Sequence, residues 1–261
     1  MGLNIALPFA LEFSIVTIFG LVLGSFATAM AARIPEERSW IAAEKNENRK
    51  AARSACSNCK ASLKFYNLIP LFSWIVQRGK CTQCAHKISI SYPLIELSTA
   101  LICIAAYGVY GAALSTLWIC LAAPFLVSLF AIDLKYYILP NQLVGILAGI
   151  GMIRLLVEFP SIEMSNYVIS AILYSALIFM IGKIVTSVLK KEALGLGDVK
   201  LFAVCGLWLG LSNLTLFLIF CGVLGVVFGG IWQYLSGKKI FPFGPAIIAS
   251  FLLLLLGQGF F

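Results

Sequence analysis

Charged residues are scarce in this sequence of 261 residues: Asp, Glu, Lys and Arg together make up 11% of it, and the mean hydropathy is +0.99. This scarcity excludes an ordinary soluble domain, in which about a quarter of the residues are charged. Instead, 61% of the residues are hydrophobic, and they form apolar blocks long enough to cross a bilayer. The composition therefore predicts an all-α polytopic membrane protein.

Basic residues are absent from the N-terminal segment, since residues 1–32 contain no Lys or Arg. A secretory signal begins with a basic segment, so its lack favours a retained first span with the N-terminus outside. Turn signals near 108–111, 158–160 and 212–213 divide the longer blocks, and eight spans result. The blocks are residues 3–32, 94–132, 139–189, 201–235 and 240–261.

Lys and Arg are also missing from every second turn. The turns near residues 111, 162 and 213 contain none, whereas eleven lie within 33–87. By the positive-inside rule the basic face is cytoplasmic and both termini are outside. Topology thus explains the formal net charge of +8, and no nucleic-acid partner is needed. The other basic residues of this face are Lys135, Lys190, Lys191, Lys200, Lys238 and Lys239.

Aspartate occurs only twice, as Asp133 and Asp198. Each lies where an apolar run meets a basic stretch, at the predicted cytoplasmic end of its span. A carboxylate is costly to desolvate, so acids at such places are candidates for chemistry. Gly195 and Gly197 precede Asp198 and would let another backbone approach it. Two acids, one activating water and one protonating the leaving amine, would suffice for aspartyl proteolysis.

Helix dipoles suggest different roles for the two acids. Asp198 begins a predicted helix, where the dipole favours its anion, and Asp133 ends one, where the dipole favours its neutral form. The hypothesis is therefore that Asp198 is the base and Asp133 the acid. The alternatives are a helix N-terminal acid at Asp198 and an interfacial acid paired with Lys135 at Asp133. Lys200 is two positions from Asp198 on the same helix, so it is expected to face elsewhere as an interfacial anchor.

Histidine is limited to His86, but four cysteines form two C-x-x-C pairs separated by 21 residues. Such a pattern predicts a zinc ribbon, and a metal would stabilise the only sizeable soluble segment, residues 33–91. Disulfides or a redox motif are the alternatives, which a cytoplasmic location disfavours. Because four thiolates complete the site, His86 is expected to be a surface residue. The predicted ligands are Cys56, Cys59, Cys81 and Cys84.

Six short motifs together resemble the type IV prepilin peptidases, the bifunctional leader peptidases and N-methyltransferases of the bacterial inner membrane. Asp198 lies within the fifth of these motifs, and Asp133 lies six positions before the fourth. The motifs are GSF at 24–26, RGKC at 78–81, YPLIE at 92–96, LP at 139–140, GLGDVKL at 195–201 and PFGP at 242–245. Ser91, Asn141 and residues 27–29 depart from the family pattern.

The resemblance implies a cleavage site and a methyl-transfer site. Asp133 and Asp198 would be catalytic, with Gly195, Gly197 and Lys200 in support. For methyl transfer it implies the residues Gly79, Lys80 and Glu96. The resemblance also implies S-adenosylmethionine as the methyl donor. No glycine-rich fingerprint of a soluble methyltransferase occurs in the sequence, so the composition gives this activity no independent support.

The resemblance also implies substrates and domains. The substrates would be prepilin or pseudopilin precursors of type IV pili or type II secretion, cut after a glycine at the cytoplasmic membrane face. The expected domains are a first transmembrane helix (1–32), a cytoplasmic zinc-ribbon-like insert associated with methyl transfer (33–91) and a seven-helix peptidase domain (92–261). A presenilin-type intramembrane protease and an ion-coupled transporter are the alternative functions. The sequence gives no prediction of oligomeric state.

Overall fold

The computed structural model describes residues 8–36, 55–56, 58–159, 161–190, 194–238 and 240–257. The chain forms two compact units, residues 1–128 and residues 129–261, and the division falls inside helix α4 (Leu114–Tyr136). Six of the described helices are long and apolar enough to cross a membrane. The predicted all-α membrane architecture is therefore confirmed.

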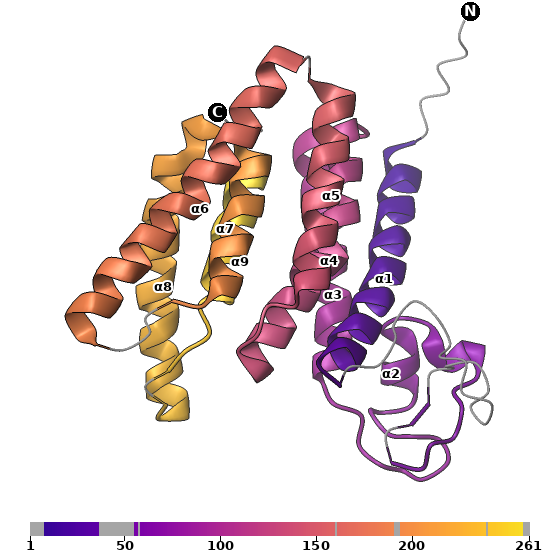
Figure 1. Ribbon diagram of the computed structural model, residues 1–261. Coiled ribbons are helices and arrows are strands. Elements are labelled where there is room, and N and C mark those ends of the chain that lie inside the picture. Colours follow the sequence, from indigo (N-terminus) through magenta and orange to yellow (C-terminus); the bar gives the residue numbers. More distant parts are fainter. Residues whose placement is uncertain are drawn as a thin grey trace, which may run out of the picture. The chain divides into compact units, whose positions relative to one another are not determined.

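In the first unit, α1 (Phe9–Arg33) and α3 (Ser91–Tyr110) lie side by side (Figure 1). The two helices approach closely at Gly24, where an added Cβ would lie only 2.6 Å from the Cα of Glu96. The hydroxyl of Ser128 in α4 donates to the carbonyl of Ala27 in α1 at 3.0 Å. The close contact at Gly24 gives a physical reason for the glycine of the GSF motif.

Residues 55–90, named here the cysteine module, lie beyond one end of α1 in the same unit (Figure 1). The module contains a 3₁₀ turn, η2 (Phe65–Leu68), and a short helix, α2 (Phe72–Val76). Its β-structure is limited to two isolated bridges, Ala55–Ser62 and Lys80–Lys87, among the described residues. A further 3₁₀ turn, η1 (Ile34–Glu36), follows α1. The zinc-ribbon prediction thus applies to the cysteine pairs, while the segment between them is mostly irregular apart from η2 and α2.

The second unit contains the end of α4 and five further helices. Each predicted break between spans is confirmed, because helices end or begin at all three places. Helices α7 and α9 are only 14 residues long, about 21 Å, which is less than the hydrocarbon core of about 30 Å. Six of the eight predicted spans are therefore helices long enough to cross a membrane, and the other two, α7 and α9, are shorter. The elements are α5 (Asn141–Glu158), α6 (Ser161–Leu189), α7 (Leu196–Leu209), η3 (Leu211–Asn213), α8 (Leu214–Ser236) and α9 (Gly244–Gly257).

Helix α7 is buried over most of its length and packs against α5, α6 and α9 (Figure 1). At its C-terminal end, Arg154 of α5 donates from its guanidinium to the carbonyl of Trp208 at 3.0 Å and to Glu158 at 2.9 Å. The hydroxyl of Tyr174 donates to the carbonyl of Gly210 at 3.0 Å. Arg154 lies within a candidate membrane span, and its charge is paired with Glu158 while it also binds a carbonyl at the end of α7.

Candidate functional site

Asp133 lies in the last turn of α4 and is buried, with 5% of its surface exposed. Its Oδ2 accepts a hydrogen bond of 2.9 Å from the backbone N–H of Gly244, the first residue of α9. A Cβ at Gly244 would lie 2.6 Å from that oxygen, which real Cβ atoms essentially never show. The carboxyl of Asp133 is therefore held at the start of α9 by a contact that requires glycine.

Asp198 lies in the first turn of α7, and its backbone N–H donates to the carbonyl of Gly195 at 3.1 Å. Its side chain extends back over Gly195, where a Cβ would come within 3.3 Å of Oδ2. Asp133 is near enough for the two like charges to interact. The two acids thus lie within one unit, an arrangement on which the sequence alone gives no information, and Gly195 leaves one side of Asp198 uncovered.

Leu139 fills the space between the helices that carry these contacts. Its Cβ would lie 3.1 Å from a Cβ at Gly197, and its Cδ2 would lie 3.2 Å from a Cβ at Gly244. The leucine of the LP motif therefore packs between the N-termini of α7 and α9. Both glycines allow this close approach, which brings the first turn of α7 near the end of α4.

The contact with Gly244 changes the argument from helix dipoles. Asp133 ends α4, as predicted, but its carboxyl also faces the N-terminus of α9 through the Gly244 N–H. An N-terminus favours a carboxylate anion. Both acids therefore lie at helix N-termini, and the dipoles no longer distinguish the acid from the base. The PFGP motif indicates that a helix starts there, since a Gly-Pro pair is common at a helix start. It does not indicate that Gly244 contacts Asp133.

Lys200 bonds to Asn141 through its ammonium, which donates to the amide oxygen at 2.8 Å. Both residues are exposed. The pair connects the first residue of α5 with the first turns of α7, so it joins two helices at the same end as the acids. This position agrees with an interfacial residue that supports the site from outside, and the partner of Asn141 is Lys200 rather than Asp133.

The four predicted metal ligands come together in the cysteine module, where their sulfur atoms all lie within 4.8 Å of one another. The sulfurs of Cys56 and Cys84 are 3.8 Å apart, and those of Cys59 and Cys81 are 4.0 Å apart. A tetrahedral ion with bonds of about 2.3 Å separates its sulfur ligands by about 3.8 Å. The cluster therefore has the dimensions of a four-thiolate metal site.

The two C-x-x-C pairs also have the same backbone geometry. In the first, the N–H of Cys56 donates to Ala61 and its carbonyl accepts from Lys60, and in the second Cys81 makes the same bonds with His86 and Ala85. Lys60 and Ala85, which follow the second cysteine of each pair, both have positive φ, of 58° and 55°. This internal repeat presents the thiols of both pairs to one point, and His86 takes part through its backbone.

Charge at the cluster is divided unevenly. The backbone N–H of His86 lowers the pKa of Cys84 to about 6. For Cys59, a hydrogen bond from Ala61 acts in the same direction, but burial and the neighbouring sulfurs outweigh it and raise the pKa to about 11. Four thiols this close resist full ionisation because each thiolate repels the next. A thiophilic divalent cation would remove that repulsion, so the residues fit a metal such as zinc.

The three residues expected in methyl transfer occupy two places in the first unit. Gly79 has a φ of +65° and lies against the ring of Trp74, and Lys80 follows it with an exposed side chain. Glu96 lies in α3, where its Oε2 accepts the backbone N–H of Leu71 at 2.8 Å. The described contact of Glu96 is thus to the turn before α2, and not to Gly79 or Lys80.

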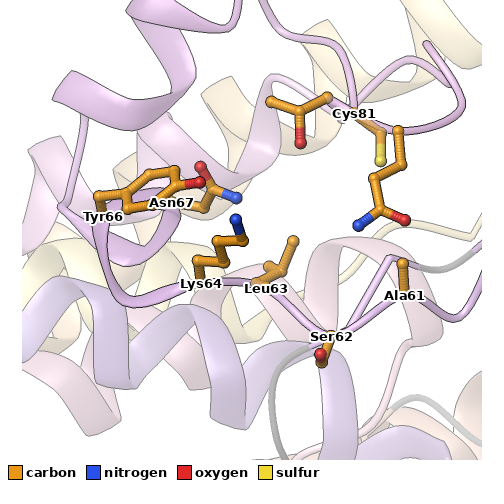
Figure 2. A pocket seen from close by; sticks show the side chains of 9 residues that line it. Ala61, Ser62, Leu63, Lys64, Tyr66, Asn67 and Cys81 are labelled. Carbon is orange, nitrogen blue, oxygen red and sulfur yellow. The ribbon is translucent and has the colours of Figure 1, made fainter.

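A small cavity of about 150 Å³ lies beside the cluster. Figure 2 shows Lys64, Tyr66 and Asn67 on one side of it and Ala61 and Cys81 on the other. Sites for whole cofactors usually measure about 300–1,000 Å³. The cavity is polar and could take only part of a donor as large as S-adenosylmethionine. The remaining lining residues are Ser62, Leu63, Thr82 and Gln83.

Two family models match the chain. The model described as the Bacterial Peptidase A24 N-terminal domain matches residues 18–110, which include the cysteine module. The model of the Type IV leader peptidase family matches residues 120–230, which include Asp133 and Asp198. No solved structure matches the chain.

Several curated proteins resemble the chain over nearly their whole length. The prepilin leader peptidase/N-methyltransferase of Aeromonas hydrophila is 35% identical, with 95% of this chain and 92% of that protein covered. The protein with the same description from Neisseria gonorrhoeae is 30% identical, covering 95% and 91%. The one from Bacillus subtilis is 32% identical, covering 92% of both. The similarity thus spans both compact units.

Proposed function

The chain belongs to the prepilin leader peptidase/N-methyltransferase family, and we propose that it removes the leader from prepilin-like precursors with Asp133 and Asp198 as the catalytic pair. The observation that carries this proposal is the convergence of α4, α7 and α9 on one place, where Gly244 holds Asp133 and Leu139 packs beside Gly197. The chain's two aspartates are 65 positions apart in sequence, and this packing joins them.

The arrangement supports an aspartyl mechanism. One carboxylate removes a proton from water, whose oxygen attacks the carbonyl carbon of the scissile peptide bond. The other carboxyl, in its protonated form, hydrogen-bonds the carbonyl oxygen and then gives its proton to the leaving amine as the C–N bond breaks. Gly195 would leave room for an extended substrate backbone beside Asp198, whereas the space at Gly197 is taken by Leu139.

The substrate reaches this site at the membrane surface. The helix ends that carry the acids are the ends flanked by Lys135, Lys190, Lys200 and Lys238, which the positive-inside rule assigns to the cytoplasm. A precursor whose apolar helix spans the bilayer would present its leader junction, a glycine in the proposed substrates, at the same level. We therefore place cleavage at the cytoplasmic face of the inner membrane, with both termini of the chain outside.

The cysteine module would carry the second activity, methylation of the new N-terminal amine. S-adenosylmethionine would supply the methyl group, and Gly79 and Lys80 directly precede Cys81, which belongs to the cluster and lines the cavity. Zinc held by the four thiolates would stabilise the module, which has little apolar core of its own. In this proposal Glu96 positions the module by its bond to Leu71.

The test incubates the purified full-length protein with a prepilin-like precursor and S-adenosylmethionine, and the products are weighed by mass spectrometry. We expect leader loss followed by gain of one methyl group. Asp133→Asn and Asp198→Asn should each lower the cleavage rate by about 10³-fold or more, while zinc content stays unchanged. Glu163→Gln, the same chemical change at an exposed acid in α6, serves as the matched control. Cleavage at the normal rate in either Asn variant would disprove the assignment.

A further inference from the structure

One stretch of the cysteine module exposes a series of large apolar side chains, named here the apolar patch. These residues recur every three or four positions across η2 and α2, and Phe65 is 82% exposed and Phe72 62% exposed. Exposed apolar surfaces of this extent usually mark a contact with another molecule or with a membrane. The patch consists of Phe65, Leu68, Ile69, Phe72, Ile75 and Val76.

The other side chains of the same stretch point into the module. The indole N–H of Trp74 donates to the carbonyl of Ile88 at 3.3 Å, and Gly79 packs against its ring. The side-chain amide of Gln77 donates to that of Asn67 at 3.0 Å. The stretch is therefore folded, with its polar groups satisfied inside and its apolar residues directed outward.

A hydrogen bond fixes the level of the patch relative to a membrane-spanning helix. Residues 70–72 form a γ-turn, in which Phe72 donates to Pro70 and the central Leu71 has φ 58° and ψ −52°. The Leu71 N–H points out of this turn to Glu96, at 2.8 Å. A turn of this kind is rare and strained, so an acceptor that holds it indicates a fixed position.

Glu96 follows Ser91, the first residue of α3, by five positions, or about 7.5 Å along the helix axis. The turn that precedes α2 thus lies level with the second turn of a candidate membrane span. Interfacial segments bury their apolar faces about 5–10 Å into the boundary between headgroups and acyl chains. The apolar patch is therefore at interfacial depth, and the exposed Leu94 and Leu97 lie in the same part of α3.

The charge of the module matches an anionic membrane surface. Residues 55–95 contain five Lys or Arg and no Asp or Glu. Lys64 and Arg78, both exposed, stand immediately before and after the segment that carries the patch. Basic residues bordering an apolar face are typical of segments that lie in the interface of membranes with anionic lipids.

We propose that the apolar patch is inserted into the bilayer interface, with acyl chains against Phe72 and Ile75 and anionic headgroups near Lys64 and Arg78. The cysteine module then rests on the membrane surface instead of extending into the aqueous phase. This inference does not depend on which reaction the enzyme catalyses, because it rests on exposure, depth and charge. It gives the apolar residues between the two cysteine pairs a partner that the module itself does not provide.

The experiment places the photoreactive residue benzoylphenylalanine at Phe72 or at Ile75 of the full-length protein. The control carries it at Gln83, which is exposed in the second C-x-x-C pair and lies outside the patch. Each protein is reconstituted in vesicles of phosphatidylethanolamine and phosphatidylglycerol, illuminated, and analysed by mass spectrometry. Zinc content shows that the module is folded, and the two patch positions give independent readings.

We expect lipid adducts at Phe72 and Ile75 and none above background at Gln83. Equal lipid labelling at all three positions, or its absence from the patch, would overturn the proposal. The measurement is repeated with a prepilin-like precursor present. If adducts to the precursor replace those to lipid, or if adducts join two copies of the chain, the patch is a protein-binding surface and the proposal is wrong.

Discussion

The backbone N–H of Gly244 donates a hydrogen bond of 2.9 Å to Oδ2 of Asp133, across 111 positions of sequence. This bond connects the last turn of α4 with the start of α9 and satisfies one oxygen of a buried carboxyl. It occupies the side of Asp133 that faces α9, so in the proposed mechanism the other oxygen, Oδ1, would be the one that reacts. The geometry depends on the absence of a side chain at Gly244.

Gly244→Ala should therefore impair cleavage. The new Cβ would lie 2.6 Å from Oδ2, so either Asp133 or the start of α9 must move. A displacement of about 1 Å at a reacting group can lower a rate by about 100-fold. We expect a loss of this order in kcat for prepilin cleavage, measured by the appearance of leader peptide.

Gly222→Ala is the matched control for that variant. Gly222 lies inside α8, and a Cβ there would have no neighbour within 4 Å. We expect normal cleavage, because alanine favours a helix more than glycine does. If Gly244→Ala cleaves as fast as Gly222→Ala, the contact with Asp133 does not position the acid.

Much of the architecture could be predicted from the sequence because the deciding signals are local. A span needs only a sufficient apolar length, and the breaks at 158–160 and 212–213 are visible as polar or turn-forming residues. The C-x-x-C pairs likewise contain their own geometry, since each forms the same backbone hydrogen bonds. Asp133 and Asp198 could be selected because carboxylates are rare in such a chain.

Other relationships could not be predicted, because they depend on how distant helices pack. Leu139 separates Gly197 from Gly244, and nothing near Leu139 in the sequence indicates either neighbour. For the same reason, helix dipoles predicted from the sequence do not distinguish the acid from the base. The N-terminus of α9 meets Asp133 only in the folded chain. The bond between Glu96 and Leu71 likewise requires a γ-turn whose central residue is leucine, a residue with no preference for positive φ.

Substitutions of Glu96 should distinguish a positioning role from a chemical one. Glu96→Ala leaves the Leu71 N–H without its acceptor, at a cost of about 1–3 kcal/mol if no water replaces it. Glu96→Gln keeps an oxygen acceptor. We expect the Ala variant to lose methyl transfer and to be cut faster by trypsin in the cysteine module. It should keep most of its peptidase activity. The Gln variant should resemble the wild type in all three measurements. Equal loss of methyl transfer in both, with normal protease resistance, would indicate a chemical role for the carboxylate.

The bond between Lys200 and Asn141 should contribute little to the free energy of unfolding because both side chains are exposed. Exposed side-chain pairs that include a charge usually contribute about 0–1 kcal/mol to it. We expect Lys200→Gln and Asn141→Ala each to lower kcat/KM by less than about tenfold, and the double variant to show no further loss. A double-mutant cycle on prepilin cleavage measures this. Loss from Lys200→Gln comparable to that from Asp198→Asn would instead place Lys200 in the chemistry.

Removal of one thiol should empty the metal site. The four sulfurs lie within 4.8 Å, and a hydroxyl at position 59 is a poor ligand for an ion that prefers thiolates. We expect about one zinc per chain in the wild type and almost none in Cys59→Ser, measured by atomic emission after purification. Cys103→Ser is the matched control, because Cys103 is buried in α3 away from the cluster.

Zinc that persists in Cys59→Ser would contradict a four-thiolate site. A Cys56–Cys84 disulfide in the wild type isolated under reducing conditions would contradict it too. Because the proposed metal would hold both cysteine pairs, its loss should also expose the module to proteolysis and abolish methyl transfer.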